Sequence, residues 1–297
     1  MNQFMSLPGG RTIDASRGPL VMGIVNLTPD SFFPGSRTPD AGAAVQRALT
    51  LLSEGADIID FGAESTRPGS IEVPESEEIR RLIPVLRAFR ARSSAIVSID
   101  TRHAGTARAA LADGADIVND ISAMQDPAMI EAVAGTGASV VLMHMRGDPQ
   151  HMQENPVYGD CALEVRDFLV GRANALLAAG LKPSQIILDP GLGFGKNLEH
   201  NLDIMRRLYL FVECGYPVLV GVSRKRMIGE ITGKPVGERL AGSLGAACAA
   251  CAQGAAIIRV HDVAATKDAL AVFMATSAHG GGWQSWKSPP GTIAGTV

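Results

Sequence analysis

The sequence predicts a single-domain α/β protein, a (β/α)8 TIM-type barrel in which eight parallel strands alternate with helices. Eight short apolar runs recur along the 297 residues, and nearly every one ends in a polar residue. Such runs are typical of strands that are buried on both faces. Amphipathic segments separate the runs, and the chain length fits one barrel with short extensions.

The eight predicted strands can be given in chain order by their sequences. They are LVMGIVN (20–26), ADIIDFG (56–62), AIVSID (95–100), ADIVND (115–120), SVVLMH (139–144), QIILDP (185–190), PVLVGVSRK (217–225) and AAIIRVH (255–261). In a barrel of this kind, the side chains at the carboxyl ends of the strands surround one site. The polar residues that end these runs are therefore the candidates for chemistry.

Helices are predicted between the strands, where most segments close near a glycine. In the first of them, Val45, Leu49 and Leu52 share one helical face. The phrases EGAD, DGAD and QGAA repeat one helix-to-strand junction, which favours a repeated βα unit over separate domains. The predicted helical segments are 40–55, 74–92, 103–114, 126–137, 161–180, 197–215, 240–254 and 263–278.

The predicted organisation has three parts. Residues 1–18 form an N-terminal extension, expected to add a small lid or hairpin over the bottom of the barrel. Residues 19–279 form the barrel, and 280–297 form a Gly- and Pro-rich tail that is predicted to be flexible and disordered. Long connections at 28–39, 63–74 and 146–160 follow strands, where substrate-binding loops are common.

Composition points away from several functional classes. The formal net charge of −3 argues against a nucleic-acid or acidic-membrane binder, and no apolar stretch has the length of a membrane helix. The N-terminus lacks the pattern of a signal peptide, so a cytoplasmic protein is expected. Of the four cysteines, Cys248 and Cys251 form a CxxC pair, but no second pair with the spacing of zinc ligands is present. All four are therefore expected to be structural and reduced.

Three strand ends carry groups that suit a heterocyclic ligand. Asp100, Asn119 and Asp189 are expected to project into the barrel mouth. Carboxylates accept hydrogen bonds from the NH and NH2 groups of an aminopyrimidinone, and an amide can both donate and accept. A strand-end cap or an ion pair would explain any one of them, but three together favour a binding site.

Basic residues near the other strand ends predict an anion site. Lys225 is expected to point inward, and Arg259 and His261 alternate along the last strand, so both face one way. With Arg67 from the STRPG loop and Asn26, they would form an anion cradle. The amide oxygen of Asn26 could also coordinate a hard cation such as Mg²⁺.

The segment DPGLGFGK at 189–196 allows its backbone to approach a ligand closely, and Phe194 offers an aromatic wall. It lacks the spacing of a Walker phosphate loop. His144 could act as a base, but it has no triad-like partner and is expected to have a structural role.

The ordered motifs NLTPDSF, ESTRPG, SIDT, NDI, MH, LDPGLGFGK, SRK and RVHD resemble those of the dihydropteroate synthase family over about 19–275. The resemblance implies a folate-pathway transferase, a sulfonamide target, that condenses 6-hydroxymethyl-7,8-dihydropterin pyrophosphate with p-aminobenzoate. It also implies a Mg²⁺ requirement and a homodimer. Pyrophosphate and dihydropteroate would be the products.

The resemblance also implies roles for individual residues. Asp100, Asn119, Asp189 and Lys225 would hold the pterin, with Met143 against its ring. Asn26 with Mg²⁺, Arg67, Arg259 and His261 would hold the pyrophosphate. The p-aminobenzoate slot would be formed by Thr66, Pro68, Phe194 and Arg226. The residues expected to carry catalysis are Asn26, Asp100, Asp189, Lys225 and Arg259.

The chain departs from the family pattern at a few positions. Pro34 replaces the usual acidic residue of the first loop, so that carboxylate's role cannot be transferred. Arg226 stands where serine is frequent, and 60–65 reads DFGAES in place of DIGGES. Three alternatives remain: a pterin-binding methyltransferase acting on a corrinoid protein, a non-catalytic pterin-binding paralogue, and an unrelated phosphate-binding barrel enzyme.

Overall fold

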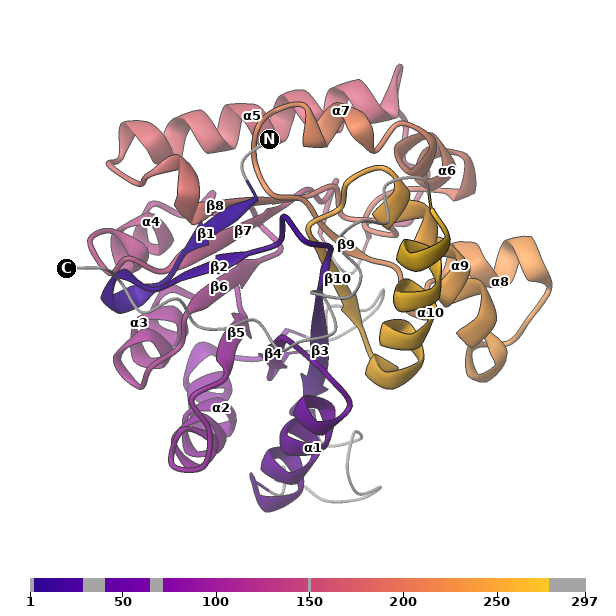
Figure 1. The fold of residues 1–297 in the computed structure, drawn as a ribbon. Coiled ribbons are helices and arrows are strands. Elements are labelled where there is room, and N and C mark those ends of the chain that lie inside the picture. The colour runs from indigo at the N-terminus through magenta and orange to yellow at the C-terminus, as the bar shows by residue number, and fades with distance from the viewer. Residues whose placement is uncertain (1–2, 29–40, 65–71, 149–150, 278–297) are drawn as a thin grey trace.

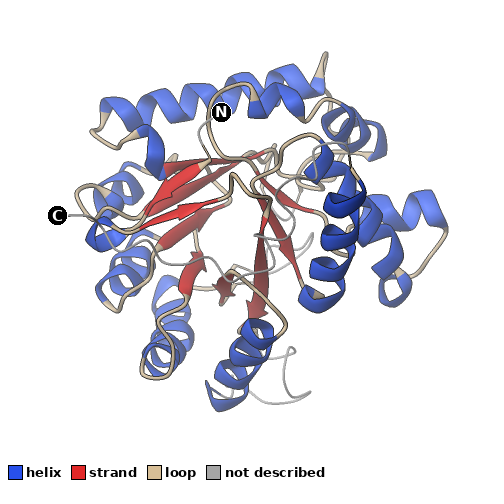
Figure 2. Cartoon of the chain, in the orientation of Figure 1, coloured by secondary structure: helices blue, strands red, loops and turns tan. Residues whose placement is uncertain are grey.

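The computed structural model describes residues 3–28, 41–64, 72–148 and 151–277. Eight parallel strands form its main sheet, in the order β8-β7-β6-β5-β4-β3-β10-β9. A parallel bridge between Leu188 and Val218 joins the two end strands, so the sheet closes on itself (Figure 2). The predicted barrel is confirmed. Its strands are β3 (Leu20–Asn26), β4 (Ile58–Gly62), β5 (Ile96–Asp100), β6 (Ile117–Asp120), β7 (Ser139–Met143), β8 (Ile186–Asp189), β9 (Leu219–Gly221) and β10 (Ile257–Val260).

Helices surround the barrel on its outside (Figure 1). Their inward faces are apolar and pack on the outward faces of the strands; Leu51 and Leu86, for example, are fully buried there. The helices are α1 (Ala41–Ser53), α2 (Glu75–Arg90), α3 (Ala104–Ala112), α4 (Pro127–Val133), α5 (Cys161–Ala178), α6 (Leu198–Arg206), α7 (Tyr209–Val212), α8 (Arg226–Thr232), α9 (Leu240–Ala252) and α10 (Val263–Thr276).

Two helical predictions need correction. The single helix expected over 197–215 is wrong, because the chain leaves helical geometry at Arg207 (φ −120°, ψ 27°) and forms α6 and α7. The Arg207 guanidinium binds the carboxylate of Asp160 at 2.9 Å, which ties the break to the start of α5. Helix α8 was not predicted. It is short, buries only Met227 and Ile228, and ends at Gly233 in the left-handed conformation.

The N-terminal segment forms an antiparallel hairpin of β1 (Phe4–Ser6) and β2 (Thr12–Asp14). Figure 1 shows this hairpin crossing one end of the barrel. Met5, Leu7 and Ile13 are buried there in a cluster that includes residues from the amino ends of the barrel strands. The hairpin therefore covers the end opposite the predicted site, whereas the expected tail at 280–297 lies outside the described residues.

Strand register brings the polar strand ends to one level. Asn26 of β3 pairs with Gly62 of β4, Gly62 pairs with Asp100 of β5, and Asp100 pairs with Asn119 of β6. On the far side, Met143 pairs with Asp189. The functional candidates therefore stand around one mouth of the barrel. In the described part of the chain, no helix is both long and apolar enough to cross a membrane.

Candidate active site

A narrow cavity opens at the carboxyl ends of the strands. Polar groups and apolar walls share its lining, which suits a flat polar ring. Seven of the predicted site residues meet here: four come from the strands β5 to β8, Phe194 and Lys225 come from loops, and Arg259 reaches in from β10. The lining residues are Asp100, Asn119, Ile121, Met143, Asp189, Gly191, Leu192, Phe194, Gly221, Lys225 and Arg259.

Arg259, which lines this cavity, lies between two carboxylates. Its Nε donates to Oδ2 of Asp60 at 2.7 Å, and its Nη2 donates to Oδ2 of Asp100 at 2.7 Å. Burial raises the pKa of Asp100 to about 7, with the charge of Asp60 adding to the effect and that of Arg259 opposing it. Although burial opposes the charged form of Arg259, the two carboxylates raise its pKa. The guanidinium is therefore always charged and held in one orientation.

Lys225 and Asp189 form the opposite side of the cavity. The Lys225 ammonium lies 4.5 Å from the centre of the Phe194 ring, a cation–π geometry. Burial lowers the pKa of Lys225 to about 8, partly offset by Asp189. Burial also raises the pKa of Asp189, whose Oδ1 accepts a hydrogen bond from the Gly191 amide at 2.7 Å. This side thus offers a cation and an oriented carboxylate next to an aromatic wall.

A larger cavity adjoins the narrow one and shares Asp100, Phe194, Lys225 and Arg259 with it. The remaining cradle candidates within the described chain, Asn26 and His261, also line it, and so does the rim residue Arg226. Arg67, Thr66 and Pro68 lie outside the described residues, as does Pro34. The two cavities therefore provide adjoining spaces for a ring and for an anionic group.

The cradle residues differ in how they are held. His261 lies with its Nδ1 3.0 Å from Oγ of Ser223. The side chain of Arg226 is 77% exposed and pairs with Glu230 at 2.6 Å, so it stands at the rim of the larger cavity. Arg224, which sequence reasoning did not single out, binds Asp262 at 2.6 Å. Of the SRK cations, Lys225 alone lines the narrow cavity.

Two further residues were missed as contributors to the site. Asp60 interrupts the apolar run of β4, and that interruption was the signal that could have marked it as the partner of a buried cation. Lys196 ends the DPGLGFGK segment and is only 2% exposed. Its Nζ lies 2.9 Å from Nδ1 of His144, which is also buried. The described linings of the two cavities do not include His144, in keeping with the structural role expected of it.

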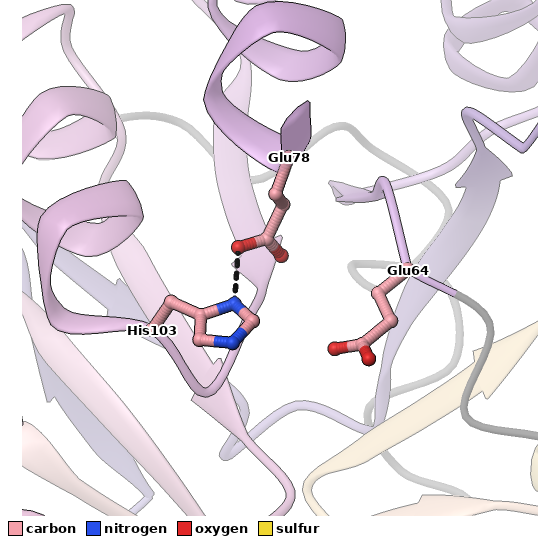
Figure 3. Close-up of side chains that lie close together, drawn as sticks. All are labelled: Glu64, Glu78 and His103. Carbon is pink, nitrogen blue, oxygen red and sulfur yellow. Dashed lines mark hydrogen bonds and ion pairs between the residues drawn. The ribbon is translucent and has the colours of Figure 1, made fainter. Parts of the chain in front are cut away.

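Glu64, Glu78 and His103 turn potential metal-ligand atoms toward one space, within 4.8 Å of one another (Figure 3). Oε2 of Glu78 accepts a hydrogen bond from the Thr101 hydroxyl at 2.8 Å and lies 2.9 Å from Nδ1 of His103. Glu64 is paired with Arg102 at 3.1 Å. Arg102 balances the charge of Glu64, whereas Oε1 of Glu78 is buried without a hydrogen-bond partner among the described residues. The hydrogen bonds of Glu78 tie α2 to the segment after β5.

Comparison with known proteins identifies this arrangement. The family described as "Pterin binding enzyme" matches residues 22–261. The dihydropteroate synthase of Haemophilus influenzae is 45% identical over 259 residues, which cover 87% of this chain and 94% of that protein. The chain belongs to the dihydropteroate synthase family. The expectation of a dihydropteroate synthase, a transferase, is thereby confirmed.

Solved structures agree with this family assignment. The Xanthomonas albilineans dihydropteroate synthase with 4-aminobenzoic acid has a TM-score of 0.85 and 45% identity, covering 92% of this chain and 98% of that one. The Burkholderia cenocepacia dihydropteroate synthase complexed with 7,8-dihydropteroate has a TM-score of 0.82 and 44% identity, covering 92% and 96%. Both structures share the barrel over nearly its whole length.

Proposed function

We propose that the chain condenses 6-hydroxymethyl-7,8-dihydropterin pyrophosphate with p-aminobenzoate and forms 7,8-dihydropteroate and pyrophosphate. The observation that carries the proposal is the convergence of Asp100, Asn119, Asp189 and Lys225 on one narrow cavity. The complexes of related synthases with 4-aminobenzoic acid and dihydropteroate support the choice of substrates.

The narrow cavity is the proposed pterin site. Asp100 and Asp189 would accept hydrogen bonds from the NH and NH2 groups of the ring, and the Asn119 amide would donate and accept. The Lys225 ammonium would donate to a ring acceptor, while Met143 packs against the ring face. The position of the cavity among the strand ends supports this assignment.

The adjoining cavity is the proposed pyrophosphate site. Asn26, Arg67, Arg259 and His261 would surround the leaving group, and positive charge there would stabilise the negative charge that develops on it. The support comes from the shared lining of Asn26, Arg259 and His261. Arg67 is included because of its position in the STRPG motif.

A Mg²⁺ ion fits the donor set that the chain offers here. Mg²⁺ takes oxygen ligands and is commonly held by few protein groups together with substrate phosphates. The amide oxygen of Asn26 is the proposed protein ligand, supported by its place on the lining of the larger cavity. When bound, the ion would neutralise pyrophosphate charge.

The proposed p-aminobenzoate slot lies between the loops at the cavity mouth. Phe194 would contact the aromatic ring, and Arg226 at the rim would attract the carboxylate. Thr66 and Pro68 complete the assignment by motif. The exposure of Arg226 and the ring of Phe194 on the cavity wall support this arrangement.

The proposed chemistry is dissociative. The C–O bond to pyrophosphate breaks first and its electron pair leaves with the pyrophosphate, producing a methylene cation conjugated with the pterin. Asp100 and Asp189 would stabilise this positive charge. The aniline nitrogen then attacks the methylene carbon, and its proton passes to water. No protein nucleophile is needed. Slow pyrophosphate release without p-aminobenzoate would support this order, whereas strict dependence on p-aminobenzoate would contradict it.

The deciding experiment is incubation of the purified protein with dihydropterin pyrophosphate, p-aminobenzoate and Mg²⁺, with both products measured. Equal rates of pyrophosphate and dihydropteroate formation would establish the reaction. Pyrophosphate without dihydropteroate would locate a defect in the p-aminobenzoate slot. Pterin binding without either product would favour the methyltransferase or the non-catalytic paralogue.

We further propose that the enzyme is a cytoplasmic homodimer. The four free cysteines fit a reducing compartment. Exposed apolar side chains on and between α8, α9 and α10, namely Ile231, Val236, Leu240 and Val272, offer a surface for a second copy. Light scattering at several concentrations tests this state, and a monomer throughout would refute it.

A further inference from the structure

Lys196 places a buried ammonium beneath the loop that follows β8. The residue is 2% exposed, and its Nζ donates to the carbonyls of Gly191 at 2.9 Å, Phe194 at 3.0 Å and His144 at 3.2 Å. Nδ1 of His144 lies 2.9 Å from the same nitrogen. One side chain thus bonds two points of the loop 191–195 and joins them to the end of β7.

The loop 191–195 has little freedom on its other sides. The left-handed conformations of Gly191 and Gly195 leave no room for a side chain, since a Cβ would overlap the carbonyl oxygens of His144 and Arg146 respectively. Gln153 donates to the carbonyl of Gly193 at 2.6 Å, and Tyr158 donates to that of Gly195 at 2.9 Å. Of these ties, the one from Lys196 is the most deeply buried.

We propose that Lys196 is a positioning residue for p-aminobenzoate: by fixing the Gly191 and Phe194 carbonyls, it holds the Phe194 ring where the second substrate binds. The inference rests on the proposed function, because it takes Phe194 as a wall of the p-aminobenzoate slot. Lys196 touches neither reacting atom and acts through the loop.

Physical chemistry favours a specific effect on this loop. An ammonium has three N–H donors and no acceptor, and it is surrounded here by four acceptors. Replacing it with an apolar chain leaves buried carbonyls without a donor, which drives the loop to rearrange. Asp100 and Asn119 stand on paired strands that Lys196 does not contact, and the Gly191 amide holds Asp189 independently of Lys196. The pterin side of the site should therefore change less than the p-aminobenzoate side.

Burial changes the pKa values of Lys196 and His144. Burial lowers the pKa of Lys196 to about 7 and that of His144 to about 3. A neutral His144 offers an acceptor nitrogen to Lys196, which fits the geometry. Neither Lys196 nor His144 lines the narrow cavity, so the pair acts on the loop and not on the ring that the cavity would hold.

The test compares Lys196→Met with the unmodified enzyme in steady-state assays that vary each substrate separately. We expect the KM for p-aminobenzoate to rise by about tenfold or more, and the KM for the pterin substrate to change by less than about threefold. Equal changes in both constants, or a fall in kcat alone, would overturn the inference.

Arg90→Met is the matched control. The Arg90 guanidinium also donates to backbone carbonyls, those of Gly114 and Ala95, but at the barrel end opposite the site. It should lower the melting temperature and leave both KM values unchanged. A selective rise in the KM for p-aminobenzoate in this control would attribute the Lys196 effect to general destabilisation.

A second variant decides the question if Lys196→Met does not fold. Gln153→Ala removes the tie to Gly193 from the half-buried side of the loop, where folding is less at risk. A selective rise in the KM for p-aminobenzoate supports the inference, and unchanged constants refute it. Turnover of the unmodified enzyme in the same assay tests the proposed function separately; without that turnover, the proposed function fails and the inference with it.

Discussion

The guanidinium of Arg259 lies 2.7 Å from the carboxylate of Asp100, and this pair spans the interior of the barrel mouth. The two residues come from β10 and β5, which are separated in the sheet by β3 and β4. Asp60 on β4 binds the same guanidinium. One cation therefore joins three strands at the floor of the proposed site, and it orients a carboxylate that we assign to pterin binding.

Asp60→Asn should change the pH dependence of the enzyme. The charge of Asp60 helps to raise the pKa of Asp100, so removing that charge should lower the pKa of Asp100 from about 7. Protonation removes the charge of Asp100 and turns one of its acceptor oxygens into a donor, so kcat/KM for the pterin substrate should fall as pH drops through about 7. In Asp60→Asn this fall should occur at lower pH. Superimposable pH profiles would contradict the role given to Asp60.

Arg259→Met should destabilise the fold as well as the site. It leaves two buried carboxylates unpaired, a change that costs about 3–5 kcal/mol. Adding Asp60→Asn removes one of those charges, so the double variant should be more stable than Arg259→Met alone. Urea denaturation of the four proteins in this cycle measures the coupling. Strict additivity would mean that the pair carries no interaction energy.

Arg259→Met should also weaken the binding of the pyrophosphate group. We expect a raised KM for the pterin pyrophosphate and a raised inhibition constant for free pyrophosphate. An unchanged KM for the pterin pyrophosphate would remove Arg259 from the proposed pyrophosphate site.

Lys225→Met should weaken binding of both the pterin substrate and dihydropteroate by about 10- to 100-fold, because a charged hydrogen-bond donor is lost. Calorimetry with dihydropteroate measures this effect apart from turnover. Lys267→Met is a suitable control, since Lys267 binds Asp57 before β4, away from both cavities. Near-normal turnover of Lys225→Met would refute its assignment.

His144→Asn should flatten the acid dependence of stability. The pKa of buried His144 is lowered to about 3 from an ordinary value of 6.5. Between these values the unfolded chain binds a proton that the folded chain does not. Stability therefore decreases as the pH drops, by at most about 1.4 kcal/mol per pH unit. Thermal unfolding at pH 6.5 and 4.5 compares the two proteins. An equal loss in both would show that His144 does not titrate on unfolding.

Removal of divalent cations should slow pyrophosphate release, and added Mg²⁺ should restore it. Asn26→Ala should raise the Mg²⁺ concentration needed for half-maximal activity, because a protein oxygen ligand is lost. Full activity after chelation would exclude the ion from the mechanism. A Mg²⁺ requirement that Asn26→Ala leaves unchanged would assign the ligand role to another group.

The barrel could be predicted from the sequence because its strands are buried on both faces and its helices are buried on one face, and each kind of burial gives a recognisable pattern of apolar residues. Each pattern depends on neighbours close in sequence, so it can be read locally. Asp100, Asn119 and Asp189 were predicted to converge because parallel strands end at the same edge. The break at Arg207 was missed because it is tied to a contact with Asp160, which is distant in sequence. Helix α8 was missed because it is short and buries only two side chains.

The sequence by itself determined the fold class, the family and the side chains that meet at the barrel mouth. Only the tertiary structure decided how those side chains are held. The Arg259 guanidinium is paired with Asp60, 199 positions away in the chain, and the Lys196 ammonium with His144, 52 positions away. Such pairings depend on barrel closure and on strand register, which bring distant residues together, and no local pattern in the sequence specifies them.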